Sequence, residues 1–146
     1  MLANGIGASL ELLQPFVDAL DPSIEVVRFD VPGVGGSPLP RIPYRLPRLA
    51  RLVARLLDRL GYRRVDMLGI SWGGMLGETY TSLFPGRTRA VVLDSPVDGD
   101  VWLNRPFHAA EEQSVGGEHS LHRFLAACTA DRETCTFGAG ADSLED

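Results

Sequence analysis

The chain has 146 residues, a length that fits one domain. Its formal net charge of −5 gives no indication of a nucleic-acid partner. No apolar run reaches the roughly 18 residues that suggest a membrane-spanning helix, and the first residues lack the basic start and apolar stretch of a signal peptide.

The first thirty residues predict one helix and one strand. Apolar side chains recur at helical spacing on Leu10, Leu13, Phe16, Val17 and Leu20. Ser9 is a candidate N-cap, and Pro15 either kinks this helix or lies in its first turn. The β-branched run at 24–30 predicts a strand, and its apolar character suits a sheet that is covered on both faces.

A glycine- and proline-rich loop and a helix come next. The loop at 31–38 lacks both a following helix and the Gly-Lys-Ser/Thr ending of a phosphate-binding loop. Residues 47–60 predict an amphipathic helix that ends at Gly61. Its polar face carries Arg48, Arg51, Arg55 and Arg59. This stripe either binds an anionic partner or is a solvated face on a helix that covers a sheet, and the pattern favours the solvated face.

The central motif is Gly69-Ile70-Ser71-Trp72-Gly73, between a predicted strand at 65–68 and a predicted helix at 75–84. Strand, sharp turn and helix around G-x-S-x-G are typical of a nucleophile elbow. Side chains two residues before and after the serine would collide with the turn, which explains the glycines. Gly74 and Gly77 are expected to let the helix approach the sheet closely. The alternative is an ordinary glycine-rich turn.

The rest of the chain predicts a third strand at 90–94, so strands and helices alternate as in a parallel sheet. Acidic residues dominate after that strand, and helices are predicted at 107–113 and 121–128 on either side of Val115-Gly116-Gly117. Cys128 and Cys135 are close enough in sequence to pair, so a disulfide and two free thiols both stay open. Ligands with metal-site spacing are absent from the sequence, and neither a metal nor a cofactor is predicted.

These motifs resemble the α/β-hydrolase family. Residues 4–78 are similar to intracellular poly(3-hydroxyalkanoate) depolymerases, through Asn4-Gly5-Ile6-Gly7-Ala8, the run at 29–37 and the elbow. Residues 81–137 resemble tripeptidyl-aminopeptidase-like α/β-hydrolases, through Val92-Leu93-Asp94-Ser95-Pro96-Val97-Asp98 and Trp102-Leu103-Asn104-Arg105-Pro106-Phe107. The expected fold class is α/β, with a partial hydrolase core at 1–98, a cap-like helical segment at 99–137 and a flexible tail at 138–146.

The resemblance implies hydrolysis through an acyl-enzyme on Ser71, with a small-molecule or polyester substrate. The backbone N–H groups of Trp72 and Ile6 would form the oxyanion hole. Asp94 is the candidate acid, and His108 and His119 are the candidate bases, although neither histidine follows a predicted strand.

The sequence also departs from the family. Only residues 1–3 match the family's third strand, and no histidine follows a final strand. Three functions therefore stay open: a serine esterase with a depolymerase-like substrate, a catalytically incomplete fragment, and an aminopeptidase-like amide hydrolase. The exposed sheet edge predicts possible self-association. The first resemblance favours a cytoplasmic location, and the second makes secretion the alternative.

Overall fold

The computed structural model describes residues 1–5, 7–135 and 137. The chain divides into two compact units, Met1–Gly99 and Asp100–Asp146. This division falls one residue after the boundary that the sequence predicts between core and cap-like segment. The predicted tail at 138–146 lies outside the described residues.

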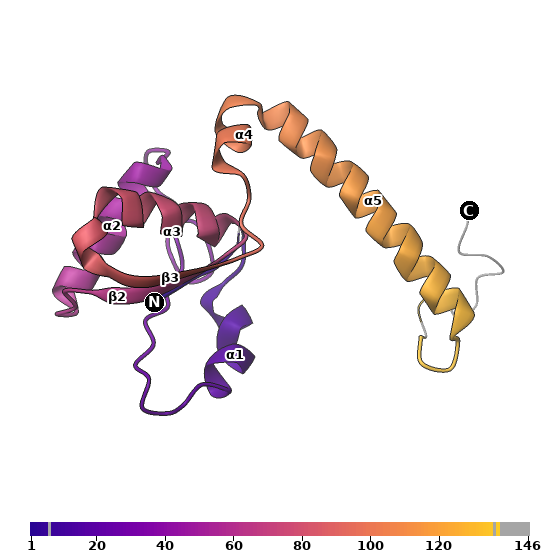
Figure 1. The fold of residues 1–146 in the computed structure, drawn as a ribbon, viewed down its shortest axis with the longest axis horizontal. Helices are drawn as coiled ribbons and strands as arrows, with labels where there is room; N and C mark the ends of the chain where they lie inside the picture. Colours follow the sequence, from indigo (N-terminus) through magenta and orange to yellow (C-terminus); the bar gives the residue numbers. More distant parts are fainter. Residues whose placement is uncertain (6, 136, 138–146) are drawn as a thin grey trace. The chain divides into compact units, whose positions relative to one another are not determined.

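The first unit contains a small parallel sheet in the order β1-β2-β3 (Figure 1). The strands are β1 (Leu2–Ala3), β2 (Val65–Ile70) and β3 (Thr88–Asp94). Leu68 in the central strand is paired with Leu2 on one side and Val92 on the other. The predicted parallel arrangement is confirmed, since both pairings are parallel and a helix connects β2 to β3.

The prediction of a full strand at 24–30 is wrong. Only Arg28 forms a bridge, to Leu2, and the Leu2 N–H donates to the Val27 carbonyl at 2.9 Å. The physical reason is the length of the neighbour, because β1 has only two residues along which a further strand can pair. Those two residues occupy the place between this segment and β2, where the family's third strand is expected, so β2 has a partner on that side over two residues.

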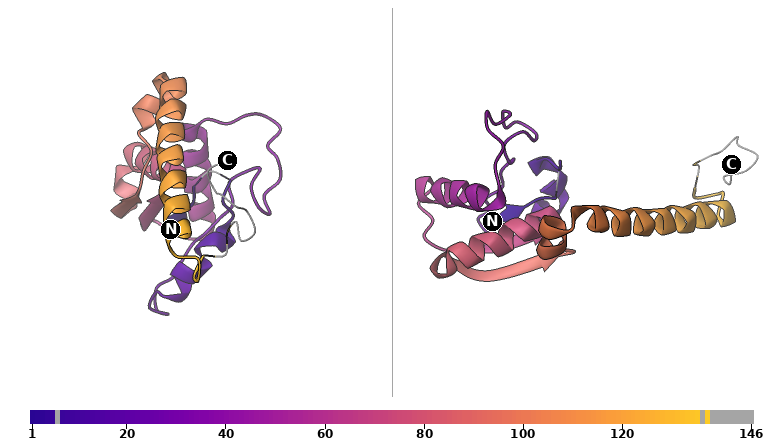
Figure 2. Two further views of the ribbon diagram at one scale, coloured as in Figure 1. Left: turned by 90° about the vertical axis from the view of Figure 1, so that its right-hand side faces the viewer. Right: turned by 90° about the horizontal axis from the view of Figure 1, so that it is seen from above.

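Two helices cover one face of the sheet. The helices α2 (Leu46–Arg59) and α3 (Trp72–Leu83) contact each other, and α3 contacts all three strands (Figure 2). Both predicted helices are confirmed, with starts one and three residues earlier than expected. The core between these layers includes four of the largest fully buried side chains of the described residues, which are Val53, Leu57, Met67 and Tyr80.

The opposite face of the sheet is less covered. The helix predicted from Leu10 onward is a 3₁₀ turn, η1 (Leu10–Leu13), followed by the short α1 (Gln14–Asp18) with Pro15 in its first turn. A hollow of about 930 Å³ is lined by apolar side chains of this region and by Leu68 and Val92 of the sheet. The expectation of a sheet covered on both faces is therefore met on one face only. A second 3₁₀ turn, η2 (Pro85–Arg87), joins α3 to β3.

The second unit is mainly one long helix. α4 (Gly99–Asn104) begins at the boundary, and α5 (Pro106–Ala130) follows. The prediction of two helices separated at Val115-Gly116-Gly117 is wrong, because α5 runs through this sequence without a break (Figure 1). Each interior glycine costs about 1 kcal/mol relative to alanine, which weakens a helix without ending it. Cys128 and Cys135 form a disulfide, with 5.2 Å between their Cα atoms.

The described residues carry neither a membrane-spanning helix nor a metal-binding cluster. None of their helices is long and apolar enough to cross a membrane. Their His, Cys, Asp and Glu side chains form no group of three that could hold a metal ion.

Candidate active site

Ser71 lies at the junction of β2 and α3 in an unusual backbone conformation, with φ 53° and ψ −120°. Its N–H donates to the carbonyl of Asp94 at 3.0 Å, and its own carbonyl accepts from the Gly74 N–H at 2.9 Å. A non-glycine residue in such a sparsely populated region costs about 1–3 kcal/mol, and strain of this kind gathers at functional sites. The chain thus makes a sharp turn between β2 and α3, and the residue in the turn carries a hydroxyl group.

The two flanking glycines are required by close backbone contacts. A Cβ on Gly69 would lie 2.5 Å from the carbonyl oxygen of Gly73. A Cβ on Gly73 would overlap the carbonyl oxygen of Ala3 and lie 2.7 Å from that of Asn4. The predicted reason for the spacing is confirmed, and it includes the loop after β1 as well as the turn itself.

The two later glycines of α3 differ from each other. A Cβ on Gly74 would lie 2.9 Å from Cβ of Pro96, so this position does allow a close approach. A Cβ on Gly77 would lie 3.4 Å from the Leu93 side chain, which is an ordinary contact. The expected close approach of the helix to the sheet is not seen at Gly77, whose neighbour Leu93 belongs to β3, and at Gly74 the close neighbour is Pro96, which follows β3.

The segment after β1 passes directly beside the serine. A Cβ on Gly5 would lie 3.7 Å from Ser71 Oγ and 3.4 Å from Ser71 Cβ. Ile6, the predicted second oxyanion donor, lies outside the described residues. Trp72, the predicted first donor, is the opening residue of α3, where backbone N–H groups point toward the N-terminal end of a helix. Both assignments stay predictions.

The carboxylate of Asp30, which was not among the predicted site residues, holds the end of this loop through a hydrogen bond. Asp30 accepts from the Leu10 N–H at 2.7 Å with Oδ1 and from the Gly36 N–H at 3.0 Å with Oδ2. Within the loop, Asn4 Nδ2 donates to the carbonyl of Ser9 at 2.7 Å. Asp30 thus links the loop beside Ser71 to the glycine-rich loop at 31–38. Part of the signal was available in the motif at 29–37, in which an aspartate precedes glycines, one of which, Gly36, donates its N–H to that aspartate.

The candidate acid lies at the same end of the sheet as Ser71. Asp94 is the last residue of β3, and its carbonyl accepts the Ser71 N–H described above. Its exposed carboxylate accepts from Ser95 Oγ at 3.0 Å. Asp94 therefore lies at the end of the sheet where a triad acid is expected, and its role as that acid stays a prediction.

The candidate bases belong to the other unit. His108 and His119 lie on α5, within Asp100–Asp146. Nε2 of His108 lies 3.5 Å from Glu112 Oε1, one helical turn along α5. Ser71 and these histidines are thus in different compact units of the chain, and their predicted partnership is not tested by the geometry within either unit.

Known proteins resemble this chain in both sequence and structure. It is 52% identical over 103 residues to a poly(3-hydroxyalkanoate) depolymerase of Ectopseudomonas oleovorans, covering 70% of this chain and 36% of the relative. It is 34% identical over 91 residues to the serine protease Hip1 of Mycobacterium tuberculosis, covering 60% of this chain and 17% of the relative. These matched stretches overlap, because together they exceed the length of the chain.

The structure gives a consistent result. A crystal structure of a hydrolase from Pseudomonas aeruginosa matches with a TM-score of 0.64 and 29% identity, over 91% of this chain and 53% of that one. This chain therefore spans little more than a third of the depolymerase and about half of that hydrolase. The family model described as alpha/beta hydrolase fold matches residues 1–138. The chain belongs to the alpha/beta hydrolase fold family.

Proposed function

We propose that the chain carries the nucleophile of a serine hydrolase that cleaves carboxylic esters through an acyl-enzyme on Ser71. The observation that carries this proposal is the conformation of Ser71, which is held in a strained turn at the start of α3 with Gly5 against its side chain. Membership of the hydrolase family supports the same chemistry.

In the proposed reaction, Ser71 Oγ attacks the ester carbonyl carbon while a base takes the hydroxyl proton, and the negative charge moves to the carbonyl oxygen. The N–H groups of Trp72 and Ile6 would stabilise that oxyanion, and one such donor is typically worth about 3–4 kcal/mol of barrier. The tetrahedral intermediate then collapses and expels the alcohol, which takes the proton from the base. In the second half of the reaction, the base takes a proton from water, the water oxygen attacks the acyl carbon, and Ser71 leaves with the proton as the free acid is released. His108 or His119 would act as the base, and Asp94 would orient it.

Substrates of the polyhydroxyalkanoate type are proposed ahead of peptides. The relative named as a poly(3-hydroxyalkanoate) depolymerase is 52% identical, and the one named as a serine protease is 34% identical. Both classes place an acyl carbon on the same serine oxygen, so the choice rests on this difference in similarity. An amide-hydrolysing activity is the alternative.

A second proposal is that the chain is a catalytically incomplete core. Two observations favour it: the chain covers only 36% of the depolymerase, and both candidate bases lie outside the unit that holds Ser71. Without its base and acid, a triad enzyme retains only the part of its rate enhancement that comes from the oxyanion hole and binding. Such a core would need a partner chain to supply the base and the acid. Independently of catalysis, the edge strand β3 would allow self-association.

The test is a burst assay with p-nitrophenyl butyrate on the purified chain beside Ser71→Ala. A stoichiometric burst or steady turnover that disappears in the variant supports the esterase. His108→Ala and His119→Ala then identify the base. Equal release from the chain and from Ser71→Ala contradicts independent activity and leaves the incomplete core. A tripeptide p-nitroanilide with a free amino terminus, assayed in parallel, distinguishes the aminopeptidase-like alternative.

A further inference from the structure

Positive charge is concentrated in one short part of this acidic chain. Residues 41–64 contain eight of the 14 arginines and a single acidic residue, Asp58. Asp58 already forms a 2.6 Å ion pair with Arg87. The four arginines of α2 itself are exposed on the outer side of the helix, and the opposite side is buried in the core. The outer face of α2 is therefore strongly cationic, and the one carboxylate of the helix, Asp58, is already paired with Arg87.

Two of these cations stand out in their surroundings. Within the described residues, the guanidinium groups of Arg55 and Arg59 have no hydrogen-bond or ion-pair acceptor. Arg51, Arg55 and Arg59 follow one another at i, i+4 spacing, where like charges on a helix repel. A bound anion would relieve this repulsion and supply the absent acceptors. Arginine is well suited to the task, because its planar fork matches a carboxylate.

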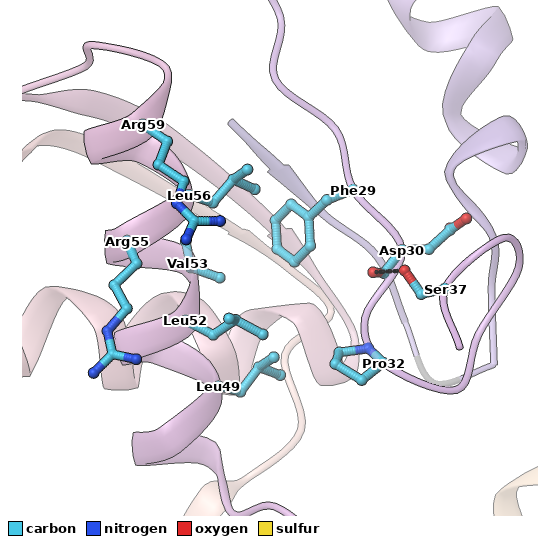
Figure 3. Close-up of a pocket in the computed structure, with 10 residues that line it drawn as sticks. All are labelled: Phe29, Asp30, Pro32, Ser37, Leu49, Leu52, Val53, Arg55, Leu56 and Arg59. Atoms are coloured by element: carbon cyan, nitrogen blue, oxygen red, sulfur yellow. Dashed lines mark hydrogen bonds between the residues drawn. The ribbon is translucent and has the colours of Figure 1, made fainter. Parts of the chain in front are cut away.

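The same two arginines line an apolar hollow of about 390 Å³ on its α2 side. In Figure 3 the Arg59 guanidinium turns toward the leucines of the hollow, and the Arg55 guanidinium points outward, so Arg55 would turn inward to meet a ligand. The hollow lies between α2 and the segment at 29–37, with Phe29 facing the leucines of the helix across it. Its apolar lining is formed by Phe29, Pro32, Leu49, Leu52, Val53 and Leu56.

The hollow also has polar groups on the side opposite α2, and these are already satisfied. Asp30 and Ser37 lie there, away from the two arginines (Figure 3). The Asp30 carboxylate accepts two backbone N–H groups, and Ser37 Oγ donates to the Asp30 carbonyl at 2.8 Å. The hollow is thus cationic on its α2 side only. None of the described residues of the elbow is among those that line it.

We propose that this hollow binds an aliphatic carboxylate, with the carboxylate on Arg55 and Arg59 and the alkyl chain along Phe29, Leu52 and Leu56. The volume is within the range of small-molecule pockets. Inorganic anions would make no apolar contact along the hollow and should bind more weakly than an aliphatic carboxylate. A neutral alcohol would gain the apolar contact but not the attraction to the two arginines. This binding does not depend on Ser71, so it is independent of the proposed hydrolysis.

The experiment is titration calorimetry of the full chain with sodium octanoate at neutral pH and low salt. We expect saturable binding that weakens at least tenfold in the double variant Arg55→Gln/Arg59→Gln and weakens as salt is raised. Arg48→Gln is the matched control, because it removes the same charge from the same helix outside the hollow. It is expected to change affinity by less than threefold, and Ser71→Ala is expected to leave affinity unchanged.

Several outcomes would overturn the proposal: no saturable binding of octanoate, equal affinity in the double variant, a larger loss in Arg48→Gln, or binding of 1-octanol as tight as that of octanoate. Binding to phosphatidylglycerol vesicles without binding of monomeric octanoate would assign the cationic face to a lipid surface and refute the hollow. Amide chemical shifts give a second measurement, since octanoate should perturb Phe29 and Leu52 while circular dichroism confirms that the double variant is folded.

Discussion

Replacing Gly73 by alanine should destabilise the first unit, although alanine is normally the better helix former. The new Cβ would overlap the carbonyl oxygen of Ala3 and crowd that of Asn4. Both are backbone atoms of β1 and the loop beside Ser71, so neither can move by a change of rotamer. Overpacking typically costs about 1–3 kcal/mol, and the gain in helix propensity returns at most about 1 kcal/mol.

The overlap with backbone oxygens puts the cost at the upper end of that range, so the expected net loss for Gly73→Ala is about 2 kcal/mol, or roughly 10 °C in Tm for a unit of this size. Two matched variants isolate the cause. Gly77→Ala lies in the same helix where a Cβ makes only ordinary contact, and it should be neutral or stabilise by up to about 1 kcal/mol. Gly86→Ala has no atom within 4 Å of the added carbon and should change stability by less than about 0.5 kcal/mol.

Thermal and urea unfolding followed by circular dichroism measure all three variants. The reasoning is refuted if Gly73→Ala unfolds at the same midpoint as the unmodified chain, or if Gly77→Ala is destabilised as much as Gly73→Ala. The first result would mean that β1 and the elbow are not in contact. The second would mean that any methyl group on α3 is harmful, whatever it touches.

Three further outcomes are expected. Asp30→Ala should lower the free energy of unfolding by about 2 kcal/mol in urea titrations, because two backbone N–H groups lose a charged acceptor. The hydrogen bond from Arg89 holds the pKa of Asp66 below its ordinary 3.8, so its stabilising contribution is present above that pH and lost as the pH falls through the lower native pKa. The unmodified chain should therefore lose more Tm than Asp66→Asn between about pH 6 and about pH 3, and equal losses would contradict the pairing. Thiol titration of denatured, unreduced protein should find Cys128 and Cys135 unreactive, and free thiols would contradict the disulfide.

The parts of the fold that were predictable have strong local signals. Residues 47–60 alternate between apolar and arginine positions at helical spacing, and the structure has α2 there. The elbow was predictable because its glycines and serine encode a backbone geometry that few other residues adopt. In each case, the information lies within a window of about a dozen residues.

The failures concern features that depend on distant residues. The apolar run at 24–30 has the composition of a strand, but a strand also needs a neighbour, and β1 offers two residues. The sequence predicts a break at Gly116 and Gly117, but α5 continues through both, since their low helix propensity weakens a long helix without ending it. Asp30 has one partner, Gly36, within its own motif and another, Leu10, 20 residues before it, and the link to Leu10 cannot be read from a local pattern.

The strain at Ser71 offers a way to separate chemistry from architecture. Its φ of 53° and ψ of −120° are disfavoured for any residue with a Cβ and open to glycine. Ser71→Gly should relieve about 1–3 kcal/mol of native strain and lose about 0.4–1 kcal/mol through the freer unfolded chain, for a net gain of about 1 kcal/mol. Ser71→Ala keeps the Cβ, and therefore the strain, and should change stability by less than about 0.5 kcal/mol.

Neither variant can form an acyl-enzyme, so the comparison by urea unfolding reports the backbone alone. If the unmodified chain has a lower free energy of unfolding than Ser71→Gly, the serine lowers stability, as expected where backbone strain serves a reaction. If Ser71→Gly is no more stable than Ser71→Ala, the turn is not strained. The conformation of Ser71 would then describe only a tight connection between β2 and α3, and the proposed nucleophile would rest on family membership alone.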